Sequence, residues 1–268
     1  MATGEYVHGY SAREHRRLND QSQTLAELLH HDTRYPDGSR VLEAGCGVGA
    51  QTVILAGNNP KVAFTSVDVS PTSVAAAKAA VERAGFGNVT FQNADIFHLP
   101  YGDASFDHVF VCFVLEHLRE PVTALSHLKR VLKPGGTLTV IEGDHGSTFF
   151  HPRSDAAWKT IQCLIDLQAA SGGDALIGRR LYPLLTQAGF GDVAVSPRFV
   201  YVDSSRPAWV EGFTRNTYIA MVEGVCEQAI KAGMISSADW EKGIADLKAS
   251  AGEQGTFCYT FFKAVAVR

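Results

Sequence analysis

The 268-residue sequence predicts an α/β fold, with a doubly wound and mostly parallel sheet of seven strands. Three observations lead to this prediction. Short apolar runs alternate with segments of helix-forming residues, several of these runs end in an acidic residue, and the first run leads into a glycine-rich turn. Strands that are apolar along their length are typical of a parallel sheet with helices on both faces, which binds ligands at its carboxyl edge.

The first strand, residues 41–44, and the turn after it form the centre of the predicted fold. The strand is apolar except for Glu43, and glycines follow at alternate positions from Gly45 to Gly49. Because glycine adopts positive φ and has no side chain, the backbone of such a turn can approach a ligand closely. We expect the turn to bind a ligand at the start of the next helix, residues 51–57.

Two further strands end in acidic residues, Asp68 and Asp95. They span residues 61–68 and 89–95. Asp68 lies about 20 residues beyond the glycines, where nucleotide-binding folds place a ribose-binding acid. Between the two strands, Ser70 is a helix cap followed by proline, and Gly85 is the expected end of that helix.

The remaining strands are predicted from apolar or alternating runs in the rest of the chain. We place them at residues 108–113, 137–142, 193–202 and 256–267, and the helices between them at residues 121–132, 155–170 and 179–188. A largely helical insertion, residues 203–253, precedes the last strand. Ahead of the core, leucines at helical spacing predict an amphipathic helix within residues 1–35.

Five motifs between residues 41 and 142 resemble those of the class I S-adenosylmethionine (SAM) methyltransferases, in the same order. They are E-x-G-x-G-x-G at residues 43–49, the acids Asp68 and Asp95, F-x-L-E-H-L at residues 113–118, and L-K-P-G-G at residues 132–136. The resemblance implies a Rossmann-like sheet of strand order 3-2-1-4-5-7-6 that is closed by an antiparallel pair. It also implies that SAM is the cofactor and that no metal is required.

The same resemblance implies the role of each cofactor residue. Glu43 and the glycines are expected to hold the amino-acid end of SAM, Asp68 the ribose hydroxyls, and Asp95 the adenine amino group. The full expected set is Tyr10, Gln23, Glu43, Gly45, Gly47, Gln51, Thr52, Asp68, Val69, Ala94, Asp95, Ile96, Phe113 and His117. For Tyr10 and Gln23, which lie in a segment that closes over SAM in many small-molecule methyltransferases, a plain packing role is the alternative.

The segment 143–152 is predicted to be a loop at the carboxyl edge, beside the methyl group. His145 is the first candidate for a proton acceptor, because histidine titrates near neutral pH and Asp144 lies next to it. A hydrogen-bonded histidine without a proton role is an equal alternative, and Glu116 and His117 are the second catalytic candidates. Acceptor contacts are expected from Tyr10, Phe149, His151, Arg179, Tyr182, Phe213, Thr217 and Met221, although an aromatic stripe in a helical insertion is more often core.

On this interpretation the chain is a single domain. We divide it into an N-terminal arm (1–35), a SAM-binding core (36–143), an acceptor-side segment (144–202), a helical lid (203–253) and the last strand (254–268).

Composition narrows the class of partner. The net charge of −4, with 19% charged residues and no basic stripe, argues against a nucleic-acid substrate, as does the absence of the N-P-P-Y motif of amino-methylating nucleic-acid enzymes. No apolar run approaches about 18 residues, and the five cysteines contain no C-x-x-C pair. We therefore expect a cytoplasmic protein with reduced cysteines and a small-molecule acceptor. A homodimer is expected only because dimers are common.

The acceptor itself is suggested by a finer resemblance. Residues 10–11, 21–29, 42–51 and 142–147 resemble bacterial natural-product C-methyltransferases that act on indole, pyrroloindoline and terpenoid-indole scaffolds. This implies methylation of an indole C3 in secondary metabolism, with loss of the N–H proton to a base. O- or N-methylation of another small natural product is the alternative.

Two other functions remain open at this point. Gly45, Gly47 and Ala50 also satisfy the dinucleotide pattern, and Tyr259 and Lys263 have the Y-x-x-x-K spacing of an NAD(P)-dependent oxidoreductase. That dyad requires a helix, whereas the predicted terminal strand separates the two residues by about 13 Å. A non-catalytic SAM-binding subunit is the third hypothesis.

Overall fold

The computed structural model describes residues 24–268, so the predictions for Tyr10 and Gln23 lie outside the described residues. Its seven-stranded sheet has the order β3-β2-β1-β4-β5-β7-β6. β1 to β5 are parallel, and β7 is antiparallel to both β5 and β6. The predicted fold class and strand order are confirmed.

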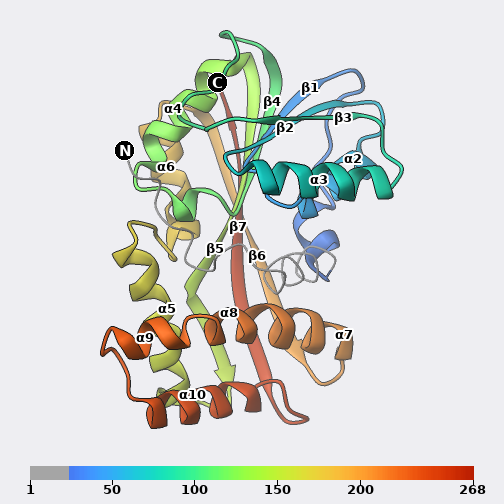
Figure 1. Cartoon of the computed structure of the whole chain (residues 1–268). Helices are drawn as coiled ribbons and strands as arrows, with labels where there is room; N and C mark the ends of the chain where they lie inside the picture. Colours follow the sequence, from blue (N-terminus) through green and yellow to red (C-terminus); the bar gives the residue numbers. More distant parts are fainter. Residues whose placement is uncertain (1–23) are drawn as a thin grey trace.

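The elements follow the predicted alternation (Figure 1). The strands are β1 (Arg40–Ala44), β2 (Ala63–Asp68), β3 (Val89–Asn93), β4 (Phe106–Cys112), β5 (Leu132–His151), β6 (Gly191–Asp203) and β7 (Thr256–Val267). The core helices are α2 (Ala50–Asn58), α3 (Pro71–Arg83), α4 (Pro121–Val131), α5 (Asp155–Ala170) and α6 (Leu181–Gln187), with short helices η1 (Leu115–His117) and η2 (Ile177–Arg180). Residues 24–30 are also helical.

The insertion is helical, as predicted. It contains α7 (Pro207–Trp209), the π-helix η3 (Val210–Ile219), α8 (Ala220–Glu223), α9 (Cys226–Lys231) and α10 (Ser237–Ala249). Figure 1 shows β5, β6 and β7 running on past the parallel part of the sheet, with α5 and these helices gathered around their far ends. Whether the insertion roofs an acceptor pocket stays a prediction.

Both faces of the sheet are covered, because neighbouring residues of a strand point to opposite sides. On one face, Leu125 of α4 and Leu181 of α6 pack with Val109 and Ala264. On the other face, Leu29 and Phe213 pack with Phe110, Ile141 and the aromatic residues of β7. These two buried clusters are the physical basis of the doubly wound architecture.

The prediction of a loop at residues 143–152 is wrong. The fifth strand does not stop at Glu142 but continues to His151. The reason is that β7 is long enough to pair with residues 149–151 as well as with residues 137–144. Asp144 pairs with Thr260 and Phe149 pairs with Cys258, so residues 145–148 bulge out opposite Tyr259 alone. A bulge redirects side chains while the strand continues.

Candidate functional site

The glycine-rich turn leaves β1 with the geometry that its sequence predicts. Gly45, Gly47 and Gly49 have φ values of 79°, 51° and 85°, and the N–H groups of Gly45 and Cys46 donate to Val67 O at 2.8 and 2.9 Å. A Cβ atom placed on Gly47 would meet nothing within 4 Å. Among residues 24–268 the turn is therefore open on this side, where a ligand can reach its backbone.

Asp68 lies at the end of β2, beside this opening. Its Oδ2 accepts a hydrogen bond from Gly47 N at 2.9 Å, and its Oδ1 accepts one from Ser70 N at 2.9 Å. Asp95 follows β3, where Oδ1 accepts from Phe97 N at 2.9 Å, and it is flanked by Ala94 and Ile96. Because Asp68 pairs with Asn93 in the sheet, the two acids share its carboxyl edge, as the sequence indicates. The neighbouring Val69 is 52% exposed.

Glu43 points into the protein. Its Oε2 accepts hydrogen bonds from Thr52 Oγ1 at 2.8 Å and from Ser66 Oγ at 2.6 Å, and the residue is 2% exposed. Burial raises the pKa of this carboxyl to about 7. In the structure Glu43 and Thr52 join β1, β2 and α2 beneath the turn, rather than projecting into the open side.

The segment after β4 closes the other side of the turn. Phe113 has a φ of 58°, a strained value for a residue with a side chain. Val114 packs against the turn so closely that a Cβ atom on Gly45 would lie only 2.4 Å from its Cγ2 atom. Glu142 holds this segment, because its Oε1 accepts from Val114 N at 3.1 Å and from Leu115 N at 2.8 Å. Glu116 and His117 follow, with 3.3 Å between the carboxylate and Nε2.

Glu142 was not among the predicted site residues. It is completely buried, and its Oε2 has no hydrogen-bond partner among the described residues. Burial and the nearby Glu116 raise the pKa of this carboxyl well above its ordinary value. In the sequence, Glu142 is visible only as a single acid at the end of the predicted strand 137–142. No neighbouring residue distinguishes it from an acid that faces solvent at a strand end.

The bulge in β5 separates the two main catalytic candidates. His145 turns toward the aromatic residues of β7, with Nδ1 2.7 Å from the Tyr259 hydroxyl. Asp144 turns to the opposite face, where both carboxylate oxygens accept from Arg179, at 2.6 Å from Nε and 2.7 Å from Nη2. Asp144 is 2% exposed, and both of its carboxylate oxygens are used in this bidentate ion pair. Asp144 therefore anchors η2 and is not a partner of the His145 ring.

The predicted acceptor residues are divided between the two faces of β7. Phe213, Thr217 and Met221 are buried on the face of Tyr259, where the Phe213 ring lies 5.9 Å from the rings of Tyr259 and Phe261. Phe149 and His151 pair with Cys258 and Thr256, which places them on the opposite face. Phe149 stacks there on Phe199, and Tyr182 of α6 is 58% exposed. These residues do not form one pocket.

The Y-x-x-x-K pair lies on a strand, as predicted. Tyr259 contacts His145, whereas Lys263 Nζ donates to Asp32 Oδ1 and Thr33 Oγ1, both at 2.6 Å. The two side chains therefore have separate partners and do not form a catalytic dyad. Lys263 instead ties the segment after the helix at residues 24–30 to β7.

The predicted cofactor residue Gln51 is held from the same N-terminal helix. Its Oε1 accepts from His30 Nε2 at 2.7 Å, and His30 is 1% exposed. Burial lowers the pKa of His30 from 6.5 to about 4. The neutral imidazole therefore helps to position the start of α2.

This pKa predicts an acid-sensitive stability. Between pH 6.5 and 4 the unfolded chain binds a proton at His30 that the folded chain does not, so this contribution is present above pH 6.5 and is lost as the pH falls toward 4. We compare the free energy of unfolding of His30→Asn with that of wild type at the same pH. This difference should be about 2 kcal/mol more favourable to the variant at pH 5 than at pH 8. Urea unfolding at both pH values measures it. The exposed His151→Asn is the control, and equal pH responses of the two variants would contradict the prediction.

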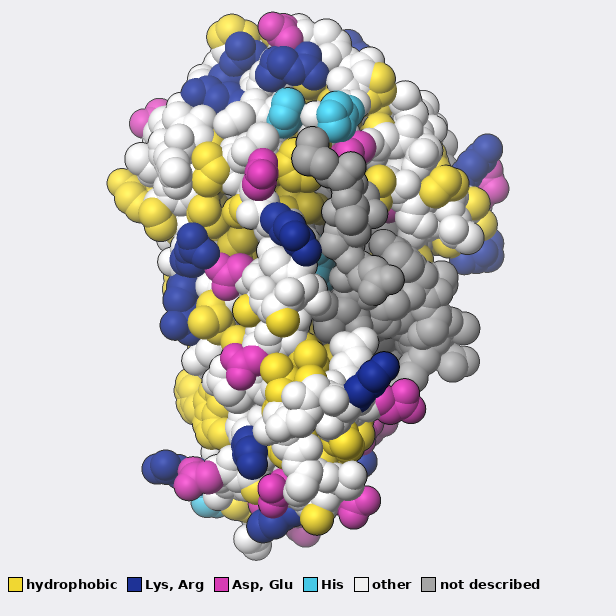
Figure 2. All heavy atoms as spheres, turned by 60° about the vertical axis from the view of Figure 1, so that its left-hand side comes forward, with side chains coloured by type: hydrophobic (Ala, Val, Ile, Leu, Met, Phe, Trp, Pro, Cys, Tyr) yellow, Lys and Arg dark blue, Asp and Glu magenta, His cyan; other side chains and the backbone are white. Residues whose placement is uncertain are grey.

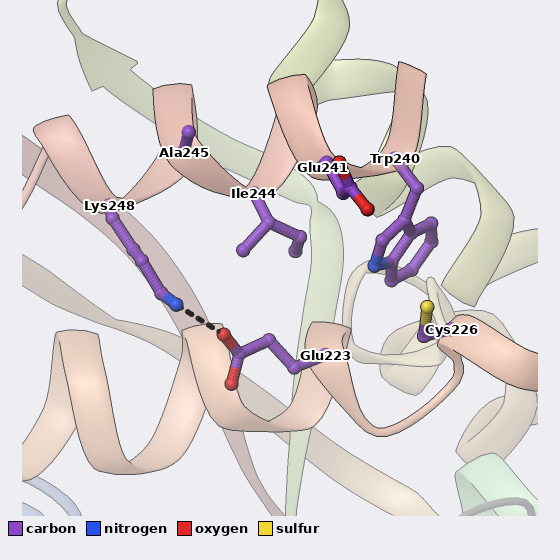
Figure 3. Close-up of a pocket in the computed structure, with 7 residues that line it drawn as sticks. All are labelled: Glu223, Cys226, Trp240, Glu241, Ile244, Ala245 and Lys248. Carbon is purple, nitrogen blue, oxygen red and sulfur yellow. Dashed lines mark ion pairs between the residues drawn. The ribbon is translucent and has the colours of Figure 1, made fainter. Parts of the chain in front are cut away.

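A separate pocket lies away from this edge, between α8, α9 and α10 (Figure 3). It has a volume of about 450 Å³ and contains the Glu223–Lys248 ion pair at 2.6 Å, beside Trp240 and Cys226. Since it belongs to the far ends of the long strands, it is distinct from the glycine-rich turn. On the face in Figure 2, basic and acidic side chains of the described residues are interspersed with hydrophobic ones.

Residues 24–268 contain no group of three or more His, Cys, Asp or Glu side chains that could hold a metal ion. Within the same range, every helix is too short or too polar to cross a bilayer.

Comparison with known proteins gives a consistent result. Residues 42–140 match a family model described as a methyltransferase domain. The O-methyltransferase cnsE of Penicillium expansum is 37% identical over 111 residues, 40% of this chain and 40% of that protein. The 27-O-demethylrifamycin SV methyltransferase of Amycolatopsis mediterranei is 33% identical over 134 residues, 50% of this chain and 49% of that protein. The chain thus spans about half the length, or less, of these two relatives.

Among solved structures, the [4+2]-cyclase SpnF aligns with 93% of this chain and 81% of its own, with a TM-score of 0.55 and 24% sequence identity. At that identity the likeness shows a shared fold and nothing about the reaction.

Proposed function

We propose that this protein is a SAM-dependent methyltransferase that acts on a small molecule, on the premise that residues 42–140 are a class I methyltransferase domain. The observation that carries the proposal is the open glycine-rich turn with Asp68 at its rim. SAM supplies an electrophilic methyl group on its sulfonium. The residues that would hold it are the turn itself, Asp68, Asp95 and the segment from Phe113 to His117.

These residues would act mainly by placement. In an in-line displacement the acceptor atom must lie directly behind the methyl carbon, and correct placement is worth up to about 7–11 kcal/mol. The bulk of Val114 against Gly45 and the two backbone hydrogen bonds that Glu142 accepts would fix one wall of the cofactor site. A rigid wall of this kind favours one orientation of the donor.

For the acceptor we propose a small aromatic product of secondary metabolism, methylated at carbon, with indole C3 as the first candidate. The ring of Phe113 lies 5.5 Å from that of Phe261, so the aromatic residues of β7 continue from the cofactor edge. O-methylation is the alternative, and it is supported by the names of the relatives from Penicillium and Amycolatopsis. We extend the proposal to a cytoplasmic, homodimeric enzyme that does not use a nucleic-acid substrate.

Calorimetric titration with S-adenosylhomocysteine (SAH), and separately with NADH, tests the cofactor. We expect SAH to bind and Asp68→Ala to weaken it about 100-fold, because a carboxylate that accepts two ribose hydroxyls contributes about 1.5–3 kcal/mol. Asp37→Ala is the matched control, since Asp37 is an exposed carboxylate that pairs with Lys61 on the surface. Binding of NADH without SAH would overturn the methyltransferase proposal.

A further inference from the structure

The hydroxyl group of Tyr259 is enclosed by protein, on the face of β7 that the insertion covers. Tyr259 is 2% exposed, and its oxygen lies 2.7 Å from His145 Nδ1. Burial, with Tyr218 and two carboxylates nearby, raises the pKa of Tyr259 well above its ordinary value, so the phenol keeps its proton.

The chain leaves space for this hydroxyl. A Cβ atom on Gly143 would lie 2.3 Å from the Tyr259 oxygen, so every other residue type at this position would displace it. The backbone of Gly143 is not in the left-handed region, and glycine is therefore not needed here for its conformation. Glycine inside a strand marks a close approach, which in this case is the approach of the phenol.

The direction of the Tyr259–His145 hydrogen bond follows from the partners. A neutral phenol has one proton to donate. Among residues 24–268, the acceptor that the hydroxyl reaches is His145 Nδ1. If Nδ1 accepts this proton, a neutral imidazole carries its own proton on Nε2.

The His145 ring is also fixed in orientation. The Tyr218 ring meets it nearly edge to face, at 6.0 Å and 84°, and the backbone N–H of His145 donates to Ala175 O at 2.9 Å. Tyr218 itself is occupied elsewhere, since its hydroxyl lies 2.6 Å from Thr148 Oγ1. The two tyrosines are equally buried, but only Tyr259 contacts a nitrogen of the imidazole.

We propose that Tyr259 is a positioning residue that holds His145 as the Nε2–H tautomer, so that Nε2 of this imidazole serves as a hydrogen-bond donor and not as a base. The part that concerns the acceptor rests on the proposed methyltransferase function. A donor at this place suits an acceptor that presents an oxygen lone pair, such as a phenolate or an enolate. An indole N–H would need another proton acceptor.

Long-range ¹H–¹⁵N correlation spectra of the ¹⁵N-labelled full-length protein at neutral pH test the tautomer directly. His145→Gln assigns the signals of His145 among the ten histidines. In wild type we expect Nδ1 to resonate as an unprotonated nitrogen and Nε2 as a protonated one. Tyr259→Phe should move the two nitrogens toward each other, as in a mixture of tautomers. Tyr218→Phe, which removes an equally buried hydroxyl, should leave them unchanged.

The outcomes are decisive in either direction. A protonated Nδ1 in wild type, a doubly protonated ring, or a Tyr259→Phe spectrum like that of wild type would each overturn the proposal. If Tyr259→Phe does not fold, Gly143→Ala displaces the hydroxyl and should also produce the mixture. Titration of the wild-type protein with SAH separates the tautomer proposal from the methyltransferase proposal. Failure of wild type to bind SAH would contradict the methyltransferase function and leave the tautomer result intact.

Discussion

Replacing Gly49 by alanine is expected to lower the free energy of unfolding by about 3 kcal/mol. Gly49 precedes α2 with a φ of 85°, and a left-handed residue with a side chain costs about 1–2 kcal/mol. In addition, a Cβ at this position would lie 2.7 Å from the Cα atom of Ala77 and 3.1 Å from its carbonyl oxygen. Because these atoms belong to the backbone of α3, they cannot rotate away, and such overpacking costs a further 1–3 kcal/mol, roughly.

Gly85→Ala is a matched control for this prediction. Gly85 has a φ of 77°, but a Cβ there would meet nothing within 4 Å. It should therefore show the conformational cost without the contact between helices. Urea unfolding of both variants measures the difference, and equal losses would show that the approach of α2 to α3 does not constrain position 49. Since α2 carries Gln51 and Thr52, Gly49→Ala should weaken SAH binding as well, whereas Gly85→Ala should not.

Glu142→Ala is expected to cost about 3 kcal/mol of stability and to weaken SAH binding at least tenfold. The substitution removes the acceptor of two N–H groups, those of Val114 and Leu115, and an unsatisfied buried donor costs about 1–3 kcal/mol. It also releases the strained backbone at Phe113, whose segment packs against Gly45 through Val114. Calorimetry with SAH and urea unfolding measure the two effects separately.

The variant Glu142→Gln separates positioning from charge. Its amide oxygen can still accept from the two N–H groups, so SAH binding should stay within a few-fold of wild type. The folded-state pKa of Glu142 is raised, so its contribution to stability is fully present below the unfolded pKa and is lost as the pH rises through the folded value. Glu142→Gln should lack this loss at high pH.

A control for general destabilisation is available in the insertion. Leu247→Ala removes a completely buried side chain of α10, away from the glycine-rich turn, and should cost a comparable 2–5 kcal/mol, roughly. If Leu247→Ala weakened SAH binding as much as Glu142→Ala did, the effect of Glu142 would be one of stability alone. The positioning role would then be abandoned.

Much of the fold could be predicted because its signals are local. The alternate glycines from Gly45 to Gly49 have positive φ in the structure, and Ser70 caps α3 by accepting from Ser73 N. Asp68 and Asp95 lie at the carboxyl edge for an equally local reason, since Asp68 is the last residue of β2 and Asp95 lies just beyond β3. Turn, cap and strand-end chemistry depend on a few consecutive residues, which a single sequence displays.

The candidate site depended more on contacts between distant segments. Residues 143–152 carry polar and glycine residues typical of a loop, yet β7, more than 100 positions later, makes them a strand with a bulge. The bulge sends Asp144 to Arg179 and His145 to Tyr259, and no local pattern indicates which neighbour goes where. The split of Phe149 and Phe213 between two faces has the same origin, because strand register is set by pairing.

The chain therefore shows two kinds of information. Its linear pattern was sufficient for the order of strands and helices, the glycine-rich turn and the acids at the sheet edge, since backbone conformation and hydrophobic periodicity act over short distances. Only the folded protein placed Glu142 under the Phe113 segment and the Tyr259 hydroxyl against His145. The first contact joins residues that are 27 positions apart in the chain, and the second joins residues that are 114 positions apart. Pairing across such distances is decided by packing of the whole sheet.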